Sequence, residues 1–283
     1  MSQIAPSVLI VEDDEKLCGL LSQVLSEGGR EVVHCQTAGA ARTHLAAQSF
    51  DLALLDIGLP DGNGLELLRS SVPAHPETRF VVMTGDESLA SVLAALRGEA
   101  YDYLCKPFST ADLRDLAERW LGSGPELRIE VHSASPEWIE LSLPCTRAAA
   151  ERSANFVRQF KAGLPADLRD EVSECFRELV MNAVEWGGAF DPERRVRVSF
   201  LRTSRMLMYR IADPGQGFRF DHLEHAAIAN QSPDPLAYAH VREAKGLRAG
   251  GLGLMIVKSR ADELIYNEAQ NEVVFIKYLT SGE

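Results

Sequence analysis

The chain has 283 residues, of which 46% are hydrophobic, and its formal net charge is −12. This length predicts about two domains, each with its own packed core. A net acidic chain lacks the excess of lysine and arginine that non-specific binding to a phosphate backbone requires, so nucleic acid is excluded as an expected partner.

Cysteine usage and hydropathy narrow the class of protein further. The five cysteines are odd in number and widely spaced, and no C-x-x-C pair occurs among them: Cys18, Cys35, Cys105, Cys145 and Cys175. This pattern predicts reduced, buried thiols rather than a disulfide framework or a zinc site. No uncharged apolar run reaches the roughly 18 residues of a membrane span, and the first residues do not read as a signal peptide. We therefore expect a cytoplasmic protein with no membrane partner.

Short apolar runs alternate with amphipathic stretches in the first half of the chain. The runs predict buried parallel strands at residues 7–11, 31–34, 51–56, 79–84 and 101–105, and the stretches predict helices at 15–27, 38–48, 64–71, 87–97 and 109–121. Five successive β-α units predict a doubly wound α/β domain with a five-stranded parallel sheet. Such sheets bind ligands beyond the carboxyl ends of their strands.

Acidic side chains gather at those strand ends. Acids occupy residues 12–14 after the first strand, and Asp56 closes the third. Converging carboxylates repel one another, and a hard divalent cation with oxygen ligands relieves the repulsion. Thr84 ends the fourth strand and Lys106 follows the fifth, and a hydroxyl beside an ammonium suits a bound phosphoryl group.

Residues 7–121 resemble the receiver domain of two-component response regulators. The matching pieces occur in unbroken order: VEDD (11–14), LLDIGLPDGNG (54–64), VVMTG (81–85) and YDYLCKPF (101–108). The resemblance implies that Asp56 is the phosphoacceptor and that a cognate histidine kinase is a partner. It also implies a role for each neighbour: Glu12, Asp13, Asp56 and the Gly58 carbonyl hold Mg²⁺, Thr84 and Lys106 contact the phosphoryl oxygens, and Tyr103 is the switch aromatic.

A boundary follows the last receiver helix. Residues 122–125, GSGP, break both helix and strand. Strand-like alternation then occurs at 127–134 and again at 135–144, and a second domain could begin at either. We predict a receiver domain at residues 1–122, a semi-rigid linker at 123–137 and an ATP-binding domain at 138–283.

The second half mixes helices and strands in another order. Helical periodicity runs over 146–162, with Gly163 as the stop, and resumes at Pro165. Strands are predicted at 194–203, 205–213, 263–268 and 271–279, and a helix at 250–263 opens on glycines. The arginines at 194, 195, 197, 202, 205 and 210 predict a solvated sheet face, with a docking surface for an acidic partner as the alternative.

The stretch from Glu174 to Gly188 is an amphipathic helix with a polar edge. Glu178 and Asn182 lie one turn apart at the border of its apolar stripe. The simpler interpretation is a solvated helix edge. The alternative is a pocket wall, in which Asn182 binds Mg²⁺ through its amide oxygen and Glu178 does acid or base work.

Two glycine-rich turns favour the pocket. Asp213 ends a strand in the sequence DPGQG (213–217), where it can accept a hydrogen bond from an amino group such as that of adenine. GGLG (250–253) opens a helix whose free N–H groups suit phosphates.

Taken together, roughly residues 138–280 resemble the ATP-binding (GHKL) fold shared by gyrase, Hsp90, histidine kinases and MutL, and within it the anti-sigma-factor serine kinases. The resemblance implies an α+β, Bergerat-type sandwich that binds ATP and Mg²⁺, with residues 219–249 as the lid. The implied roles are Glu178 as catalytic base, Asn182 as Mg²⁺ ligand, Asp213, Gly215 and Gly217 at adenine, and Gly250, Gly251 and Gly253 at the phosphates. Trp186 departs from the pattern, because many relatives carry His there, and the lid is long and interrupted by proline.

Other regulator architectures fit the sequence less well. None of the seven histidines lies on a helical hairpin as a kinase phosphoacceptor would, and no helix-turn-helix follows the receiver. Two hypotheses remain. The first is a receiver-controlled Ser/Thr kinase acting on an anti-sigma-factor antagonist of the STAS type. The second is an ATP-bound module that sequesters a sigma factor or antagonist without catalysis. A homodimer is expected in either case.

Overall fold

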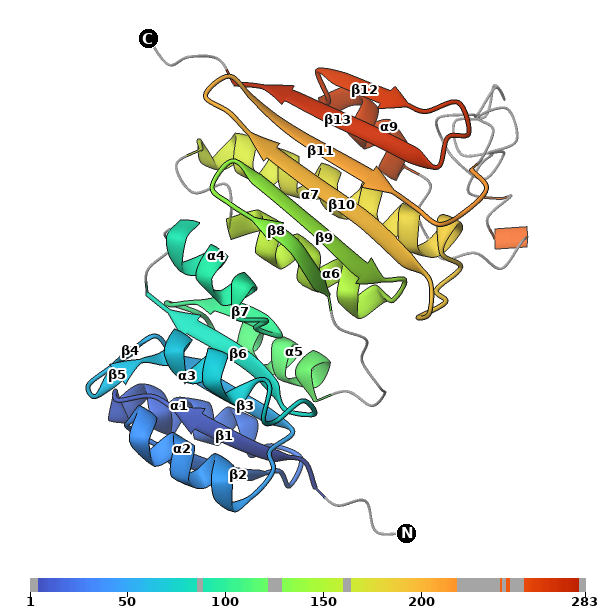
Figure 1. The fold of residues 1–283 in the computed structure, drawn as a ribbon. Coiled ribbons are helices and arrows are strands. Elements are labelled where there is room, and N and C mark those ends of the chain that lie inside the picture. Colours follow the sequence, from blue (N-terminus) through green and yellow to red (C-terminus); the bar gives the residue numbers. More distant parts are fainter. Residues whose placement is uncertain are drawn as a thin grey trace. The chain divides into compact units, whose positions relative to one another are not determined.

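The computed structural model describes residues 5–85, 89–121, 129–159, 164–217, 240, 243–244 and 252–279. The chain divides into two compact units, Met1–Glu126 and Leu127–Glu283, and each is described by itself (Figure 1). In the described residues, no helix is both long and apolar enough to cross a membrane.

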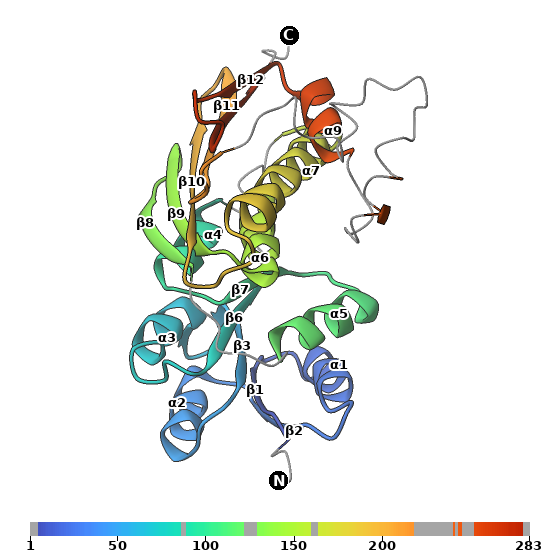
Figure 2. The ribbon, with the colours of Figure 1, turned by 90° about the vertical axis from the view of Figure 1, so that its right-hand side faces the viewer.

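The first unit is a five-stranded parallel sheet with the strand order β2-β1-β3-β6-β7. Its strands are β1 (Ser7–Val11), β2 (Glu31–Cys35), β3 (Leu52–Asp56), β6 (Arg79–Thr84) and β7 (Asp102–Cys105), and its helices are α1 (Glu15–Leu25), α2 (Ala38–Ala47), α3 (Gly64–Ser71), α4 (Leu89–Arg97) and α5 (Thr110–Trp120). Helices α1 and α5 lie together on one face, and α2 and α3 on the other (Figure 2). The predicted doubly wound fold is confirmed. A short hairpin, β4 (Gly58–Leu59) with β5 (Gly62–Asn63), was not predicted.

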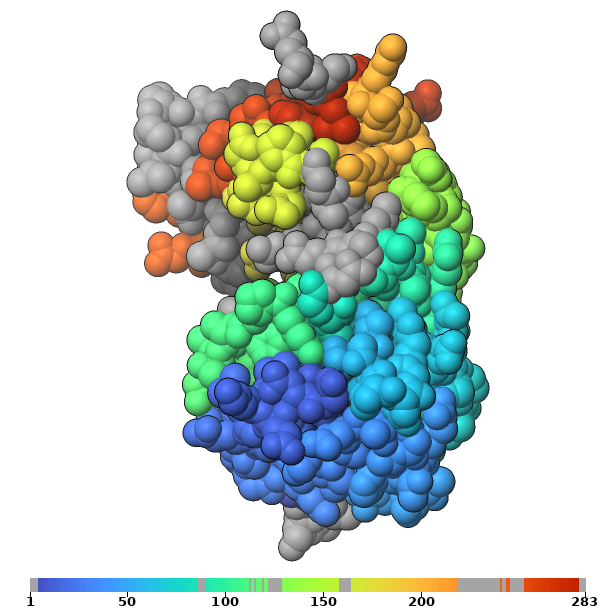
Figure 3. Space-filling model, turned by 90° about the vertical axis from the view of Figure 1, so that its left-hand side faces the viewer, coloured from blue at the N-terminus to red at the C-terminus, as the bar shows by residue number. Residues whose placement is uncertain are grey.

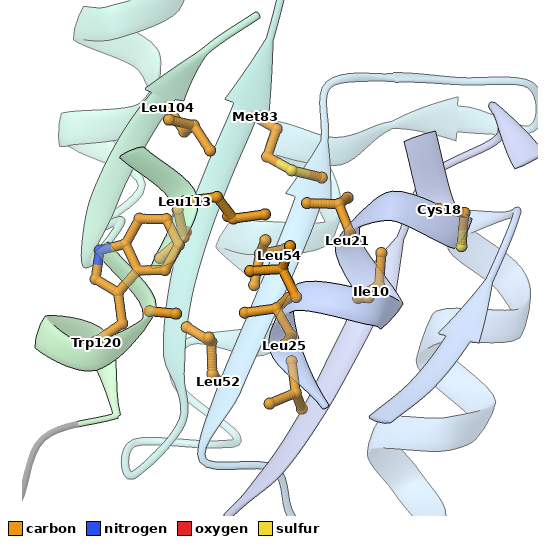
Figure 4. Close-up of a cluster of buried hydrophobic side chains, with 14 residues drawn as sticks. Ile10, Cys18, Leu21, Leu25, Leu52, Leu54, Met83, Leu104, Leu113 and Trp120 are labelled. Atoms are coloured by element: carbon orange, nitrogen blue, oxygen red, sulfur yellow. The ribbon is translucent and has the colours of Figure 1, made fainter. Parts of the chain in front are cut away.

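The core of this unit explains why its central strands are apolar on both faces. Leucines of β3 pack against α1 on one side of the sheet, and the ring of Trp120 closes the cluster from the end of α5 (Figure 4). Every residue of β3 is buried. Burial on two faces is what a parallel sheet with helices on both sides requires.

The second unit is a six-stranded antiparallel sheet with the order β12-β13-β11-β10-β9-β8. The strands are β8 (Glu130–Ala134), β9 (Trp138–Pro144), β10 (Arg195–Arg202), β11 (Met206–Ala212), β12 (Glu263–Tyr266) and β13 (Glu272–Tyr278). Helices α6 (Arg147–Gln159), α7 (Ala166–Asn182) and α9 (Gly253–Arg260) cover one face (Figure 2). The predicted α+β architecture is confirmed. Strand β8 lies inside the stretch predicted as the linker, 123–137, so part of that stretch belongs to this sheet.

Alternating burial on the strands of this sheet reflects its single helical cover. On β11 the side chains of Leu207, Tyr209 and Ile211 face the core, where Tyr209 lies 5.1 Å from Phe176 of α7 and 5.9 Å from Phe275 of β13, centroid to centroid. The β10–β11 turn stands out from the surface of this unit as the orange protrusion in Figure 3.

The structure changes one predicted helix in kind. The stretch from Glu174 to Gly188 was predicted as a single α-helix, but α7 ends at Asn182 and a π-helical turn, η1, follows from Ala183 to Gly187. The N–H of Gly188 donates to the carbonyl of Ala183 at 2.8 Å, a spacing of five residues. Single π turns of this kind occur often at functional sites.

Candidate functional site

Three carboxylates converge at the carboxyl end of the parallel sheet. Oxygens of Glu12, Asp13 and Asp56 all lie within 4.8 Å of one another. Glu12 follows β1 and is only 1% exposed, while Asp56 ends β3 and is 7% exposed. A compact set of oxygen donors with several negative charges matches the preference of Mg²⁺. These residues therefore fit the metal that the sequence resemblance implies.

Lys106 places its ammonium between two of these acids. Its Nζ lies 2.7 Å from Glu12 Oε2 and 2.9 Å from Asp56 Oδ1. Burial favours the neutral amine, but the hydrogen bonds to both carboxylates outweigh it and raise the pKa of Lys106. Burial, opposed by that same contact with Lys106, raises the pKa of Glu12. The positive charge of the Lys106 ammonium thus compensates part of the negative charge of Glu12 and Asp56.

Asp14 does not join these acids. Its carboxylate caps α1 by accepting from the backbone N–H groups of Leu17, at 3.1 Å, and Lys16, at 2.8 Å, and these bonds lower its pKa. An Asp at the N-cap satisfies N–H groups that have no partner inside the helix. The sequence grouped Asp14 with its neighbours because spacing alone does not show where a side chain points.

The other predicted receiver residues lie on β4, β6 and β7. Thr84 ends β6 and is buried, and its carbonyl accepts the backbone N–H of Lys106 at 2.8 Å. Tyr103 is buried on β7. A β-carbon on Gly58 would lie 3.6 Å from Asp56 Oδ2, which places the β4 strand beside the Asp56 carboxylate.

The sequence analysis missed one supporting residue in the first unit, Gly64. A β-carbon on Gly64 would come within 2.0 Å of the backbone oxygen of Asp56, so only glycine fits at the start of α3. The motif PDGNG (60–64) carried the signal, because Gly64 lies in it. The reason that glycine is required there is visible only from the contact of Gly64 with the backbone of Asp56 at the end of β3.

In the second unit, Glu178 faces the beginning of α9. A β-carbon on Gly253 would lie 2.1 Å from Glu178 Oε2. Asn182 lies one turn further along α7, half-buried, where the α-helix passes into η1. A carboxylate and an amide thus lie on the same edge of α7.

Asp213 lies in a tight turn after β11. Its Oδ1 accepts the backbone N–H of Gly215 at 2.7 Å, and its own N–H donates to the carbonyl of Asn271 at 2.9 Å. A β-carbon on Gly187 would lie 2.2 Å from the Asp213 carboxyl carbon, so η1 ends directly against this side chain. Burial raises the pKa of Asp213.

Gly187 is therefore a site residue that sequence reasoning missed. The pair Gly187-Gly188 was visible as the end of a helix, but its contact with Asp213 joins positions 26 residues apart. Of the remaining predicted glycines, some lie in the described residues and others do not. Gly217 adopts a positive φ of 85° and meets the carbonyl of Ala269, while Gly250 and Gly251 lie outside the described residues. The predicted lid, 219–249, also lies outside them apart from residues 240, 243 and 244.

Comparisons with known proteins assign both units. Residues 8–118 match the family described as the response regulator receiver domain, and residues 143–277 match the family described as the histidine kinase-like ATPase domain.

Individual relatives and one solved structure are similar to part of this chain. The response regulator protein FleR of Pseudomonas aeruginosa is 33% identical over 51% of this chain and 32% of its own length. The photosynthetic apparatus regulatory protein RegA of Rhodovulum sulfidophilum is 33% identical over 43% of this chain and 65% of its own. This chain therefore spans about one third to two thirds of these relatives. A receiver domain protein from Methanospirillum hungatei JF-1 is 31% identical over 43% of this chain and 100% of its own, with a TM-score of 0.40.

Proposed function

Because this chain joins a response regulator receiver domain to a histidine kinase-like ATPase domain, we propose that phosphorylation of Asp56 controls an ATP-dependent serine/threonine kinase in its second unit. The proposed substrate is an anti-sigma-factor antagonist of the STAS type. The observation that carries the proposal is that one chain contains both an acid pocket with its lysine and a helix edge, Glu178 with Asn182, facing the start of α9.

The receiver step transfers a phosphoryl group from a cognate histidine kinase to Asp56. The Asp56 oxygen attacks phosphorus, and the bond to the donor histidine nitrogen breaks with its electron pair leaving on that nitrogen. Mg²⁺, when bound by Glu12, Asp13, Asp56 and the Gly58 carbonyl, supplies positive charge to the phosphoryl oxygens. Lys106 supplies a second positive charge, since it already contacts Asp56.

The switch follows from the charge that arrives. A phosphoryl group adds nearly two negative charges, at roughly −1.5 to −2, together with three acceptor oxygens. Thr84 then turns toward those oxygens, and Tyr103 occupies the space that this leaves. Both side chains begin buried, so their movement repacks the surface around β6 and β7.

In the second unit, the proposed roles fall on three side chains, Asp213, Asn182 and Glu178, and on the backbone of the glycine-rich turn. Asp213 accepts a hydrogen bond from the adenine amino group, and Asn182 provides an oxygen for Mg²⁺. Glu178 takes the proton of the partner's serine hydroxyl. The serine oxygen attacks the γ-phosphorus of ATP, and the bond from that phosphorus to ADP breaks as ADP leaves. The backbone of Gly250, Gly251 and Gly253 receives the phosphates.

The test uses the full-length protein, γ-labelled ATP, Mg²⁺ and a candidate STAS-domain protein, with and without acetyl phosphate as phosphodonor. We expect label on a serine or threonine of the partner, its loss in Glu178→Gln, and loss of the phosphodonor effect in Asp56→Asn. ATP-dependent capture of the partner without label would instead support the non-catalytic module. Replacing the STAS-domain protein by a sigma factor in the capture assay tests the sigma factor as the alternative partner. Light scattering separately tests whether the protein is a homodimer.

If Asp56→Asn responds to acetyl phosphate as the unmodified protein does, receiver control is refuted. If the protein does not bind ATP at all, the output half of the proposal is refuted. These two results are independent, because the two pockets lie in separate units.

A further inference from the structure

The turn that carries Asp213 is held by two side chains that lie outside the nucleotide-binding motifs. Arg194, immediately before β10, donates through Nη2 to the carbonyl of Pro214 at 2.6 Å. Asn271, immediately before β13, donates through Nδ2 to the carbonyl of Gly215 at 3.0 Å. Each therefore fixes one peptide group of the turn.

Asn271 also fixes the backbone of Asp213 itself. Its carbonyl accepts the Asp213 N–H at 2.9 Å, while the Asp213 carboxylate accepts the Gly215 N–H at 2.7 Å. Rotation of the Asp213 side chain away from Gly215 would break that second bond. One residue of the β12–β13 turn thus sets both the position of Asp213 and, through Gly215, the direction of its carboxylate.

The side chain of Asn271 is in turn held in this orientation. Asn267 donates through Nδ2 to Asn271 Oδ1 at 2.8 Å, which leaves the Asn271 amide nitrogen facing Gly215. Asn267 Oδ1 accepts the backbone N–H groups of Asn271, at 3.1 Å, and Glu272, at 3.2 Å. The two turns therefore form one hydrogen-bonded assembly.

A second contact joins the same two turns. A β-carbon on Gly217 would lie 1.6 Å from the carbonyl of Ala269, so the backbones meet without a side chain between them. Burial raises the pKa of Asp213, and the positive charge of Arg194 opposes that rise and so favours the ionised carboxylate. An ionised carboxylate only accepts hydrogen bonds, and this is the form that discriminates between bases.

We propose that Asn271 and Arg194 are positioning residues that set the preference of this site for adenine over guanine nucleotides. The inference rests on the proposed function, because it requires a nucleotide base at Asp213. Adenine offers an amino group to the carboxylate, whereas guanine has a carbonyl oxygen on the corresponding ring carbon and is repelled. Discrimination of this kind depends on holding the acceptor in one direction, since a carboxylate free to turn can avoid the unfavourable contact.

The experiment measures dissociation constants for ADP and GDP by calorimetry on the full chain. Asn271→Ala removes the donor to Gly215, and Arg194→Lys keeps the charge but removes the guanidinium fork. We expect each variant to weaken ADP binding about tenfold, the loss of one hydrogen bond. The ratio of the GDP to the ADP constant should fall at the same time, which a merely structural role would not cause.

Thr203→Ala is the matched control. Thr203 holds the β10–β11 turn, at the other end of β11, by accepting the N–H groups of Arg205 and Met206 at 3.2 and 3.1 Å. Thermal unfolding of all variants identifies any that do not fold, and Arg194→Lys preserves the test if Asn271→Ala is one of them. The control should leave the base preference unchanged.

An unchanged ratio in both folded variants overturns the inference while leaving ATP binding and the proposed function intact. A loss of preference in Thr203→Ala equal to that in Asn271→Ala would also overturn it. If the unmodified protein binds neither nucleotide, the inference and the ATP-dependent output fail together. Binding with no preference in the unmodified protein overturns the inference alone.

Discussion

Gly253, the first residue of α9, lies so close to Glu178 on α7 that a β-carbon at position 253 would come within 2.1 Å of the carboxylate oxygen Oε2. The obstructed atom is the far end of a flexible side chain rather than backbone. A larger residue at position 253 therefore displaces the carboxylate instead of the helix. A substitution at position 253 can therefore test the role of the Glu178 carboxylate without disrupting the fold.

We predict that Gly253→Ala folds normally but loses phosphotransfer. The free energy of unfolding should change by less than about 1 kcal/mol, because alanine is a good residue in the first turn of a helix. Transfer to the partner should fall about 100-fold or more, which is the typical contribution of a positioned general base. Urea unfolding and the labelled-ATP assay measure the two quantities.

The control for that variant is Gly19→Ala, at an exposed position of α1 where nothing lies within 4 Å of the added carbon. It should stabilise the receiver by about 0.8–1.0 kcal/mol, the helix-propensity difference, and leave transfer unchanged. Normal transfer in Gly253→Ala would show that the carboxylate of Glu178 need not hold its position.

Asp213 predicts a pH dependence of nucleotide binding. Burial raises its pKa above 3.8, and the ionised form accepts the adenine amino group more strongly than the protonated form, whose O–H is a donor. ADP affinity should therefore be constant near neutral pH and weaken as the pH falls through the raised pKa. Calorimetry over that range measures it, and an affinity independent of pH down to 3.8 would contradict the role of Asp213.

The same shift has the opposite effect on stability. The folded state binds the Asp213 proton more tightly than the unfolded state does, so this group's contribution is fully present below pH 3.8 and is lost as the pH rises through the folded pKa. Asp213→Asn should remove that component. Chemical unfolding of the variant and the unmodified protein across the window compares the two slopes.

Gly64→Ala should destabilise the receiver severely. The added carbon would lie 2.0 Å from the backbone oxygen of Asp56, and backbone cannot move aside as a side-chain tip can. We expect the free energy of unfolding of the receiver domain to fall by about 3 kcal/mol or more, which urea unfolding measures. Phosphorylation of Asp56 by acetyl phosphate should be weak. Gly58→Ala, where the contact to Asp56 Oδ2 is an ordinary 3.6 Å, should be tolerated and is the control.

The indole of Trp120 predicts a polar contribution to receiver stability. Its Nε1 donates to the buried carboxylate of Asp102 at 2.8 Å, and Asp102 also accepts the N–H of Tyr103. Trp120→Phe removes one donor from a buried acid, which costs about 1–3 kcal/mol. Trp138→Phe, at a half-buried position on β9, is the comparison in urea unfolding. An equal loss in the free energy of unfolding in the two variants would show that the loss comes from the smaller ring and not from the hydrogen bond to Asp102.

Almost all of the receiver fold could be predicted from local sequence patterns. Residues 7–11, 64–71 and 79–84 form the predicted elements with the predicted bounds, because two-sided burial and helical periodicity are local signals. The acid pocket followed from the same patterns, since the carboxyl ends of parallel strands meet at one edge of the sheet. In the second half, the order of helices and strands was likewise visible.

Which side chains of those elements contact one another became visible in the three-dimensional structure alone. Asp14 turned to cap α1 while Glu12 turned inward. Gly187 met Asp213, and Asn271 met Gly215, because β11 pairs with β13 and brings the β12–β13 turn to the end of β11. Such contacts join positions far apart in sequence, and their distance is set by strand order and register, to which no local periodicity corresponds.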